Sequence, residues 1–280
     1  MQNVITNIWN QMFIFFHTYT PNSILISLGP LKIYWYGMFI VVGLLLAIFT
    51  TFKLAEYYGI KKENIIDLSF WLITGGIIGA RLYHVFLEYD YYLSNPLSVL
   101  KIWNGGLAIH GAIIIGAIII YRFIRKNGYS FWLITSIITP GLALGQALGR
   151  WGNYFNQEIF GKPTDMPWGI PIEFLKRPHD YSIFTHFHPT FLYESIGSLI
   201  IFGLLLWLHK KAKQGKNVSH MNITLIYLIS YSFLRLLLEF IRLDDTLIIF
   251  GIRWPQIISI IIILFSIAFI IYKNTAKNNS

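Results

Sequence analysis

The chain has 280 residues, of which 55% are hydrophobic and 12% are charged, against roughly 25% charged in a soluble domain. Its mean hydropathy of +0.56 therefore indicates a membrane protein, and the absence of cysteine excludes disulfides, thiolate nucleophiles and cysteine-bound metals. The net charge of +9 is dispersed among apolar segments, so it indicates membrane topology rather than nucleic-acid binding.

Residues 1–20 are predicted to form an amphipathic helix that lies on a membrane surface. Apolar residues recur there at helical spacing, with asparagine, threonine and glutamine opposite them. The first basic residue is Lys32. We therefore expect no cleavable signal peptide, because such a peptide begins with a basic region.

Seven later segments are long and apolar enough to cross about 30 Å of hydrocarbon. They lie near 33–52, 66–87, 105–123, 131–149, 190–208, 221–241 and 254–272. The connection 150–189 is rich in proline and aromatic residues, which predicts a small ordered head rather than a linker. The predicted fold class is an all-α polytopic membrane protein of one domain with seven transmembrane helices.

Basic residues orient this predicted bundle. Twelve of the 22 Lys and Arg residues follow the first, third, fifth and seventh spans. The positive-inside rule places those loops in the cytoplasm. The N-terminus is then outside, the C-terminus is cytoplasmic, and the head is extracytoplasmic. The chain shows no internal repeat, which counts against a transporter built from two related halves.

Ionisable residues inside spans indicate function because they are costly in hydrocarbon. Arg81, His84 and Glu88 share one face of the second span, and either a snorkelling stripe or a site fits them. The sixth span carries one polar face as well: Tyr231, Arg235, Glu239 and Arg242. An Arg–Glu pair can be internal glue, but a second arginine and a tyrosine favour an anion site, because guanidinium binds phosphate bidentately.

The fourth span ends in "GLALGQALGRWGNYFNQEIFG". Its Gly141, Gly145 and Gly149 predict close approach to another helix. Five polar residues then follow where the chain leaves the membrane: Arg150, Asn153, Asn156, Gln157 and Glu158. Interfacial capping needs fewer polar groups, so this cluster is a predicted functional site.

The fifth span opens with "HFHPTFLYES". His186 and His188 suggest a metal, but a His-x-His pair with no clear third ligand is a weak signal, and we expect no metal. Tyr193 and Glu194 enter the span as further polar groups.

His110 stands in "GGLAIHG", five residues into the third predicted span. An imidazole in such a run needs a polar partner, so it is either a packed histidine or a catalytic base. His110, Arg150, Asn153, Arg235 and Glu239 all project from outer span ends, which predicts a polar cavity in the outer leaflet.

Five motifs, in order over roughly 30–260, resemble those of the bacterial prolipoprotein diacylglyceryl transferase family. They are "WYG" at 35–37, "GGLAIHG" at 105–111, "GRWGNYFNQEIFG" at 149–161, "HPTFLYES" at 188–195 and "YSFLRLLLEFIR" at 231–242. The most specific is Gly-Arg-x-Gly-Asn-x-x-Asn-x-Glu, in which Trp151 and Gln157 look like substitutions.

The resemblance implies a reaction in the bacterial plasma (inner) membrane, with the active site toward the outer leaflet. A diacylglyceryl group moves from phosphatidylglycerol to the lipobox cysteine of a preprolipoprotein. A thioether forms and glycerol phosphate leaves, which is the first step of lipoprotein maturation. No cofactor is implied. The partners are phosphatidylglycerol, other membrane lipid and the preprolipoprotein signal peptide.

The resemblance also implies site residues. The catalytic residues are His110, Arg150 and Arg235. The substrate-binding residues are Tyr36, Arg150, Asn153, Asn156, Glu158, Gly161, Tyr231 and Glu239. Histidine suits a base, with a pKa about two units below that of cysteine, and arginines suit the departing phosphate. Either His110 or a hydroxide bound by arginine then deprotonates the thiol.

Four rival classes can be compared with a transferase. An accessory structural subunit would not need the polar cluster at 150–158. A non-catalytic lipid or ion carrier also tolerates intramembrane charges, but it gives transport and no covalent product. An intramembrane protease is disfavoured because the spans lack a GxSG motif or paired aspartates. A retinal protein is excluded because the seventh predicted span holds no lysine for a Schiff base.

Overall fold

The computed structural model describes residues 11, 14–29, 31–216 and 218–278, and most of them are helical. The chain forms two compact units. The terminal unit comprises Met1–Ala47 and Thr139–Ser280, and the middle unit comprises Ile48–Ile138. Most of the interfacial helix predicted over 1–20 lies outside the described residues, although residues 14–18 are helical.

Six helices among the described residues are long and apolar enough to cross a membrane, judged by length and composition. They are α2 (Trp35–Tyr57), α3 (Lys62–Leu87), α6 (Phe131–Asn156), α7 (Thr190–Lys213), α8 (His220–Glu239) and α9 (Trp254–Asn278). The prediction of a helical polytopic membrane protein is confirmed at this level. The third predicted span corresponds to α5 (Ile109–Asn127), which has Arg125 and Lys126 in its last turn.

The start of α5 differs from the prediction. Gly105 and Gly106 have φ of 86° and 75°, values that a right-handed helix does not contain. The helix therefore begins at Ile109 instead of residue 105. His110 is its second residue, whereas the prediction placed it five residues into the span, and its depth in a membrane stays a prediction.

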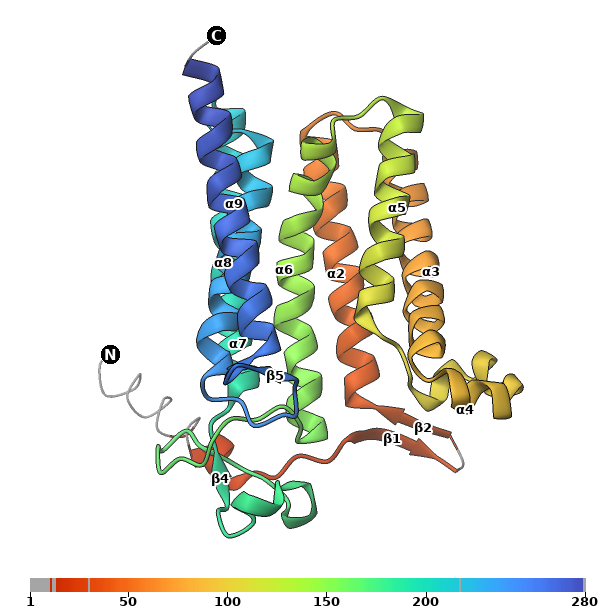
Figure 1. Ribbon diagram of the computed structural model, residues 1–280, viewed down its shortest axis with the longest axis vertical. Helices are drawn as coiled ribbons and strands as arrows, with labels where there is room; N and C mark the ends of the chain where they lie inside the picture. Colours follow the sequence, from red (N-terminus) through yellow and green to blue (C-terminus); the bar gives the residue numbers. More distant parts are fainter. Residues whose placement is uncertain (1–10, 12–13, 30, 217, 279–280) are drawn as a thin grey trace. The chain divides into compact units, whose positions relative to one another are not determined.

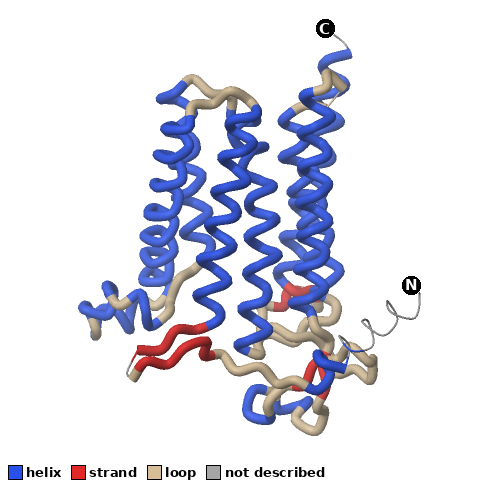
Figure 2. Tube along the Cα trace, turned by 180° about the vertical axis from the view of Figure 1, so that it is seen from behind, coloured by secondary structure: helices blue, strands red, loops and turns tan. Residues whose placement is uncertain are grey.

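In the terminal unit, α7, α8 and α9 lie side by side (Figure 1). The hairpin of β1 (Ile24–Leu28) and β2 (Leu31–Tyr34) leads directly into α2 (Figure 2). A Cβ added to Gly43 of α2 would lie 3.3 Å from the Gly145 carbonyl oxygen. The close approach predicted for the glycine run of α6 therefore occurs at Gly145, against α2.

A small layer of short elements joins α6 to α7. It contains β3 (Ile170–Pro171), η3 (Phe174–Lys176), η4 (His179–Tyr181) and β4 (His186–Phe187), with β3 paired antiparallel to β4. α6 ends at Asn156 because Gln157 turns to φ 54°, a common way to end a helix. The Gln157 side-chain amide donates to the Pro21 carbonyl and to Glu173 Oε1, both at 2.9 Å. Gln157, one of the five polar residues predicted to form a site, therefore links the end of α6 to the segment before β1 and to the short-element layer.

Another short hairpin, β5 (Ile248–Ile249) with β6 (Ile252–Arg253), precedes α9. In the middle unit, α3 and α5 lie side by side (Figure 1). Between them the chain forms α4 (Tyr89–Ser94), η1 (Pro96–Leu100) and η2 (Ile102–Asn104). Gly79 and Gly111 face each other, because a Cβ on Gly79 would lie 2.6 Å from the Gly111 carbonyl oxygen. The backbones of α3 and α5 therefore nearly touch where α5 begins.

Candidate active site

A buried carboxylate of α7 is the centre of a polar network in the terminal unit. Glu194 is 1% exposed. Its Oε1 lies 2.9 Å from Arg150 Nη2 and accepts a hydrogen bond from the Tyr231 hydroxyl at 3.1 Å. Its Oε2 lies 3.5 Å from Arg235 Nη1 and 3.7 Å from Arg242 Nη1. Because a buried charge is costly unless it is paired, these contacts hold α6, α7 and α8 together.

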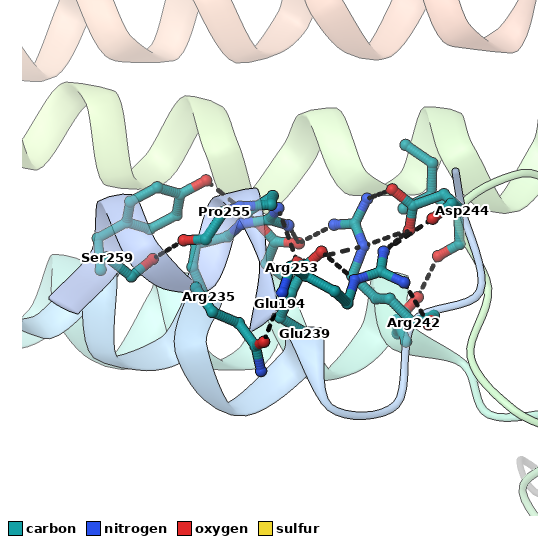
Figure 3. A network of polar contacts seen from close by, with 12 residues as sticks. Glu194, Arg235, Glu239, Arg242, Asp244, Arg253, Pro255 and Ser259 are labelled. Carbon is teal, nitrogen blue, oxygen red and sulfur yellow. Dashed lines mark hydrogen bonds and ion pairs between the residues drawn. The ribbon is translucent and has the colours of Figure 1, made fainter. Parts of the chain in front are cut away.

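A second buried carboxylate extends the network toward α9 (Figure 3). Glu239 Oε2 lies 3.2 Å from Arg235 Nη2, and Glu239 Oε1 lies 2.8 Å from Arg253 Nε. Arg242 pairs bidentately with Asp244 at 2.7 and 3.0 Å. Arg253 Nη2 donates to the Asp244 carbonyl at 2.8 Å. The predicted pairing of Arg235 with Glu239 is confirmed.

The charges of this network leave an excess of positive charge. Its four guanidinium groups (Arg150, Arg235, Arg242 and Arg253) face three carboxylates (Glu194, Glu239 and Asp244), a net charge of +1. Glu194 and Glu239 are 1% exposed, whereas the Arg150 and Arg235 side chains are 21% and 18% exposed. Arg150 and Arg235 therefore present accessible positive charge beside two buried carboxylates, as an anion site requires, and Asp244 is the more exposed carboxylate of the network, at 31%.

The signature motif forms a relay that ends on Arg150. Arg150 Nη1 donates to Asn153 Oδ1 at 3.2 Å, and Asn153 Nδ2 donates to Glu158 Oε1 at 2.7 Å. Asn156 Nδ2 also reaches Glu158 Oε1, at 3.4 Å. The Glu158 amide donates to the Asn153 carbonyl at 3.0 Å, so the turn at Gln157 folds Glu158 back onto α6. These residues therefore orient one guanidinium.

Tyr36, at the start of α2, is placed by a glycine of α6. A Cβ on Gly152 would overlap the Tyr36 ring, so only glycine leaves room for the ring there. The neighbouring Trp35 stacks on Phe155 at 4.4 Å between ring centroids. Tyr36 lies within electrostatic range of Arg150 and Glu158.

Gly161 lies where its backbone meets the backbones of His188 and Arg242. Its amide donates to the His188 carbonyl at 2.9 Å, and it forms a β-bridge with Arg242. A Cβ there would lie 2.8 Å from His188 Cβ. This glycine brings backbones together beside Arg242, and its substrate contact stays a prediction.

His110 belongs to the middle unit, and it is exposed. Its ring lies 5.7 Å from that of Tyr83, tilted by 31°. Of the groups predicted to share one cavity, the terminal unit brings together Arg150, Asn153, Arg235 and Glu239. The cavity itself, and the presence of His110 in it, stay predictions.

His186 and His188, the predicted His-x-His pair, have local roles in the short-element layer. His186 Nε2 lies 3.0 Å from the His17 carbonyl oxygen, and the two rings stack at 3.9 Å. His188 Nδ1 lies 3.1 Å from the Tyr193 hydroxyl. Burial lowers the pKa of His188, so the neutral imidazole is favoured there.

Sequence reasoning missed the hub of the network. The sequence indicates Glu194 only as a further polar group of the fifth span, and it assigns no role to Arg253 or Asp244. The available signal was a glutamate within the first two turns of an apolar span, where a charge requires a partner. Its ion-pair partners lie more than 40 positions away in both directions.

The model of the family described as "Prolipoprotein diacylglyceryl transferase" matches residues 23–272. The chain belongs to this family. The resemblance predicted from the motifs is confirmed, and every residue of the network lies within the matched range.

Relatives within the prolipoprotein diacylglyceryl transferase family carry one name, "Phosphatidylglycerol--prolipoprotein diacylglyceryl transferase". The protein of Synechococcus elongatus is 43% identical over 249 residues, which cover 89% of this chain and 86% of the relative. The protein of Trichormus variabilis is 39% identical, with 86% of each chain covered. The protein of a Synechocystis species is 38% identical, with 93% and 92% covered.

Proposed function

We infer that this protein is a transferase that moves the diacylglyceryl group of phosphatidylglycerol to a prolipoprotein, the first step of lipoprotein maturation. Family membership supports the reaction. The structural observation that carries it is the network in which buried Glu194 and Glu239 hold partly exposed arginines.

The chemistry proposed for the reaction is a displacement at carbon. The thiolate of the lipobox cysteine forms an S–C bond to the glycerol carbon that carries the phosphate. The C–O bond to that phosphate breaks, and glycerol phosphate leaves with the electron pair. The thiol proton passes to a base. The nucleophile belongs to the substrate, in agreement with a chain that has no cysteine.

Arg150 and Arg235 are proposed to bind the phosphate of the lipid. Charge develops on the phosphate oxygens as the C–O bond breaks, and preorganised cations stabilise that charge. Glu194 holds both guanidinium groups before substrate arrives, so little reorganisation is required. Asn153, Asn156 and Glu158 orient Arg150 and contact the glycerol hydroxyls, while Tyr36, Tyr231, Gly161 and Glu239 complete the substrate site.

His110 is proposed as the base that takes the thiol proton. It is exposed at the start of α5, and imidazole is the side chain best suited to accept a proton near neutral pH. General bases are typically worth about 10²- to 10⁴-fold in rate.

The proposed topology puts this site in the outer leaflet of the bacterial plasma membrane. In the terminal unit, the network lies where α6 and α8 end and α7 begins, whereas Lys210, Lys211 and Lys213 end α7. The positive-inside rule places those lysines in the cytoplasm. With α5 as a seventh span, the N-terminus is outside and the C-terminus inside.

A purified-component assay tests this function. The full-length protein is mixed with phosphatidylglycerol and a peptide that carries a lipobox cysteine, and the product is read by mass spectrometry. We expect the peptide to gain one diacylglyceryl group on cysteine, with stoichiometric release of glycerol phosphate. A peptide that stays unmodified while the protein moves lipid or ions across sealed vesicles would support the carrier instead.

A further inference from the structure

We propose that Arg81 is a positioning residue that fixes the place and angle of His110 through the loop before α5. The proposal rests on the function proposed above for His110. It concerns a charge within the candidate span α3 that the phosphate-binding network does not use. All contacts that carry it lie within the middle unit.

Arg81 is 6% exposed, and its guanidinium is saturated by backbone carbonyls. Nε donates to the Val99 carbonyl at 2.9 Å. Nη1 donates to Gly105 and Gly106 at 2.7 and 2.9 Å. Nη2 donates to Ser98 and, at 3.4 Å, to Lys101. A guanidinium has five N–H donors, and all five are directed at this loop.

This saturation separates Arg81 from the phosphate-binding arginines. Arg150 and Arg235 are held mainly by carboxylates and remain partly exposed, whereas Arg81 keeps no donor for a substrate phosphate. Its acceptors are carbonyls at the ends of the short helices η1 and η2. Carbonyl oxygens at the ends of helices carry partial negative charge and attract positive charge. Arg81 therefore acts on the chain, not on the lipid.

The loop that Arg81 holds leads directly to His110. Gly105 and Gly106 are five and four residues before it and have positive φ, so their orientation sets the direction in which α5 starts. A Cβ on Gly106 would lie 2.5 Å from Arg81 Nη1. The guanidinium thus packs directly against the turn that aims the helix.

The neighbours of Arg81 on α3 hold the residues on both sides of His110. The Ala108 amide donates to the Ala80 carbonyl at 3.0 Å, and Gly111 packs against Gly79. The Tyr83 ring contacts the His110 ring. One turn of α3 therefore supports His110 in three ways: Arg81 binds the preceding loop, Gly79 and Ala80 contact the backbone on either side of His110, and Tyr83 contacts its ring. A base must be held within hydrogen-bond reach of its proton, and this support supplies that precision.

A double-mutant cycle between Arg81→Lys and His110→Gln tests the proposal. Lysine keeps the charge but has three donors at one point, so it cannot span carbonyls from Ser98 to Gly106. We expect Arg81→Lys to lower the single-turnover rate by about 10- to 100-fold at saturating phosphatidylglycerol, because small misplacements of catalytic groups cost that much. In the His110→Gln background, the same change should cost less than about threefold.

A pH profile supplies a readout that a merely structural role would not move. If Arg81→Lys disables the base, its rate should rise with pH toward about 8.5, where the peptide thiol ionises unaided. His110→Gln should behave in the same way. Arg122→Lys, an exposed change on α5, is the matched control and should retain the wild-type rate and profile.

The outcomes separate the proposal from the function on which it rests. Equal fold losses for Arg81→Lys in both backgrounds, or a wild-type rate, would overturn the positioning role while leaving the base intact. If His110→Gln alone keeps the full rate, His110 is not the base, and no coupling between Arg81 and His110 is expected. If Arg81→Lys does not fold, Tyr83→Leu removes the ring contact and enters the same cycle, where multiplicative losses overturn the proposal and non-multiplicative losses support it.

Discussion

At Glu194, one carboxylate compensates guanidinium groups from α6, α8 and the segment after α8. Replacing it with glutamine would leave these positive charges without their shared counter-charge. We expect Glu194→Gln to lower the free energy of unfolding by about 3–5 kcal/mol, as for other broken buried pairs. Thermal unfolding in detergent measures the change.

Two comparisons make the Glu194 prediction specific. Adding Arg150→Gln removes the guanidinium that pairs with Glu194 at 2.9 Å and should recover part of the lost stability. Glu56→Gln breaks an exposed pair with Lys53 and should cause no measurable change, because exposed pairs contribute little. Equal melting temperatures for Glu194→Gln and Glu56→Gln would contradict the role of Glu194 as hub.

Arg150 contacts acceptors at two of its nitrogens, Glu194 at Nη2 and Asn153 at Nη1. Lysine preserves the charge but not this fork. Since hydrogen bonds to charged groups contribute about 1.5–3 kcal/mol each, Arg150→Lys should lower turnover by roughly 10- to 100-fold with the protein still folded. The transfer assay measures the rate, and exposed Arg125→Lys is the control. A near-normal rate would show that a point charge suffices.

At the scale of elements, the contact of α2 with α6 places Tyr36. Gly152→Ala introduces a Cβ that overlaps the Tyr36 ring, and such overpacking costs about 1–3 kcal/mol. We expect turnover to fall at least severalfold as the ring moves. Gly203→Ala on α7 is the matched control, because its Cβ would meet open space. Equal activity of the two variants would contradict the placement of Tyr36 by Gly152.

The connection from α8 to α9 is held by Asp244. Burial alone would raise the pKa of its carboxyl, but hydrogen bonds and charge from Arg242, with Arg253, hold that pKa below its ordinary value. The stabilisation is therefore complete above about pH 3.9, the pKa of an unfolded aspartate, and is lost as pH falls through the lower folded pKa.

A pH series of melting temperatures tests this linkage. Asp244→Asn should be less stable than wild type at pH 7, and the difference should shrink as pH falls below about 4. Subtracting the two curves removes the contribution of His188, whose pKa burial lowers. A difference that stays constant down to pH 3 would contradict the role of Asp244.

At the scale of the whole molecule, the absence of cysteine allows the topology to be mapped with single introduced thiols. Leu175→Cys lies on the exposed surface of η3, and Gln214→Cys follows the lysine-rich end of α7. An impermeant thiol reagent should label the first in intact cells and the second only after permeabilisation. The reverse pattern would contradict the proposed orientation.

The sequence by itself determined the membrane class, the approximate spans and the family. Apolar length and motif order are local properties that can be read without knowing any contact. Arg150, Arg235 and Glu239 were identified in this way, because the motifs that contain them are contiguous. Tertiary structure decided what these residues touch.

Glu194 became the hub only when α6, α7 and α8 packed together, since its ion-pair partners are remote in sequence. The sequence left Arg81 as part of a snorkelling stripe or of a site, and only the structure shows that its guanidinium binds carbonyl oxygens between Ser98 and Gly106. The start of α5 depended on two glycines with positive φ. A buried charge is stable only beside its partner, and packing between distant segments selects that partner.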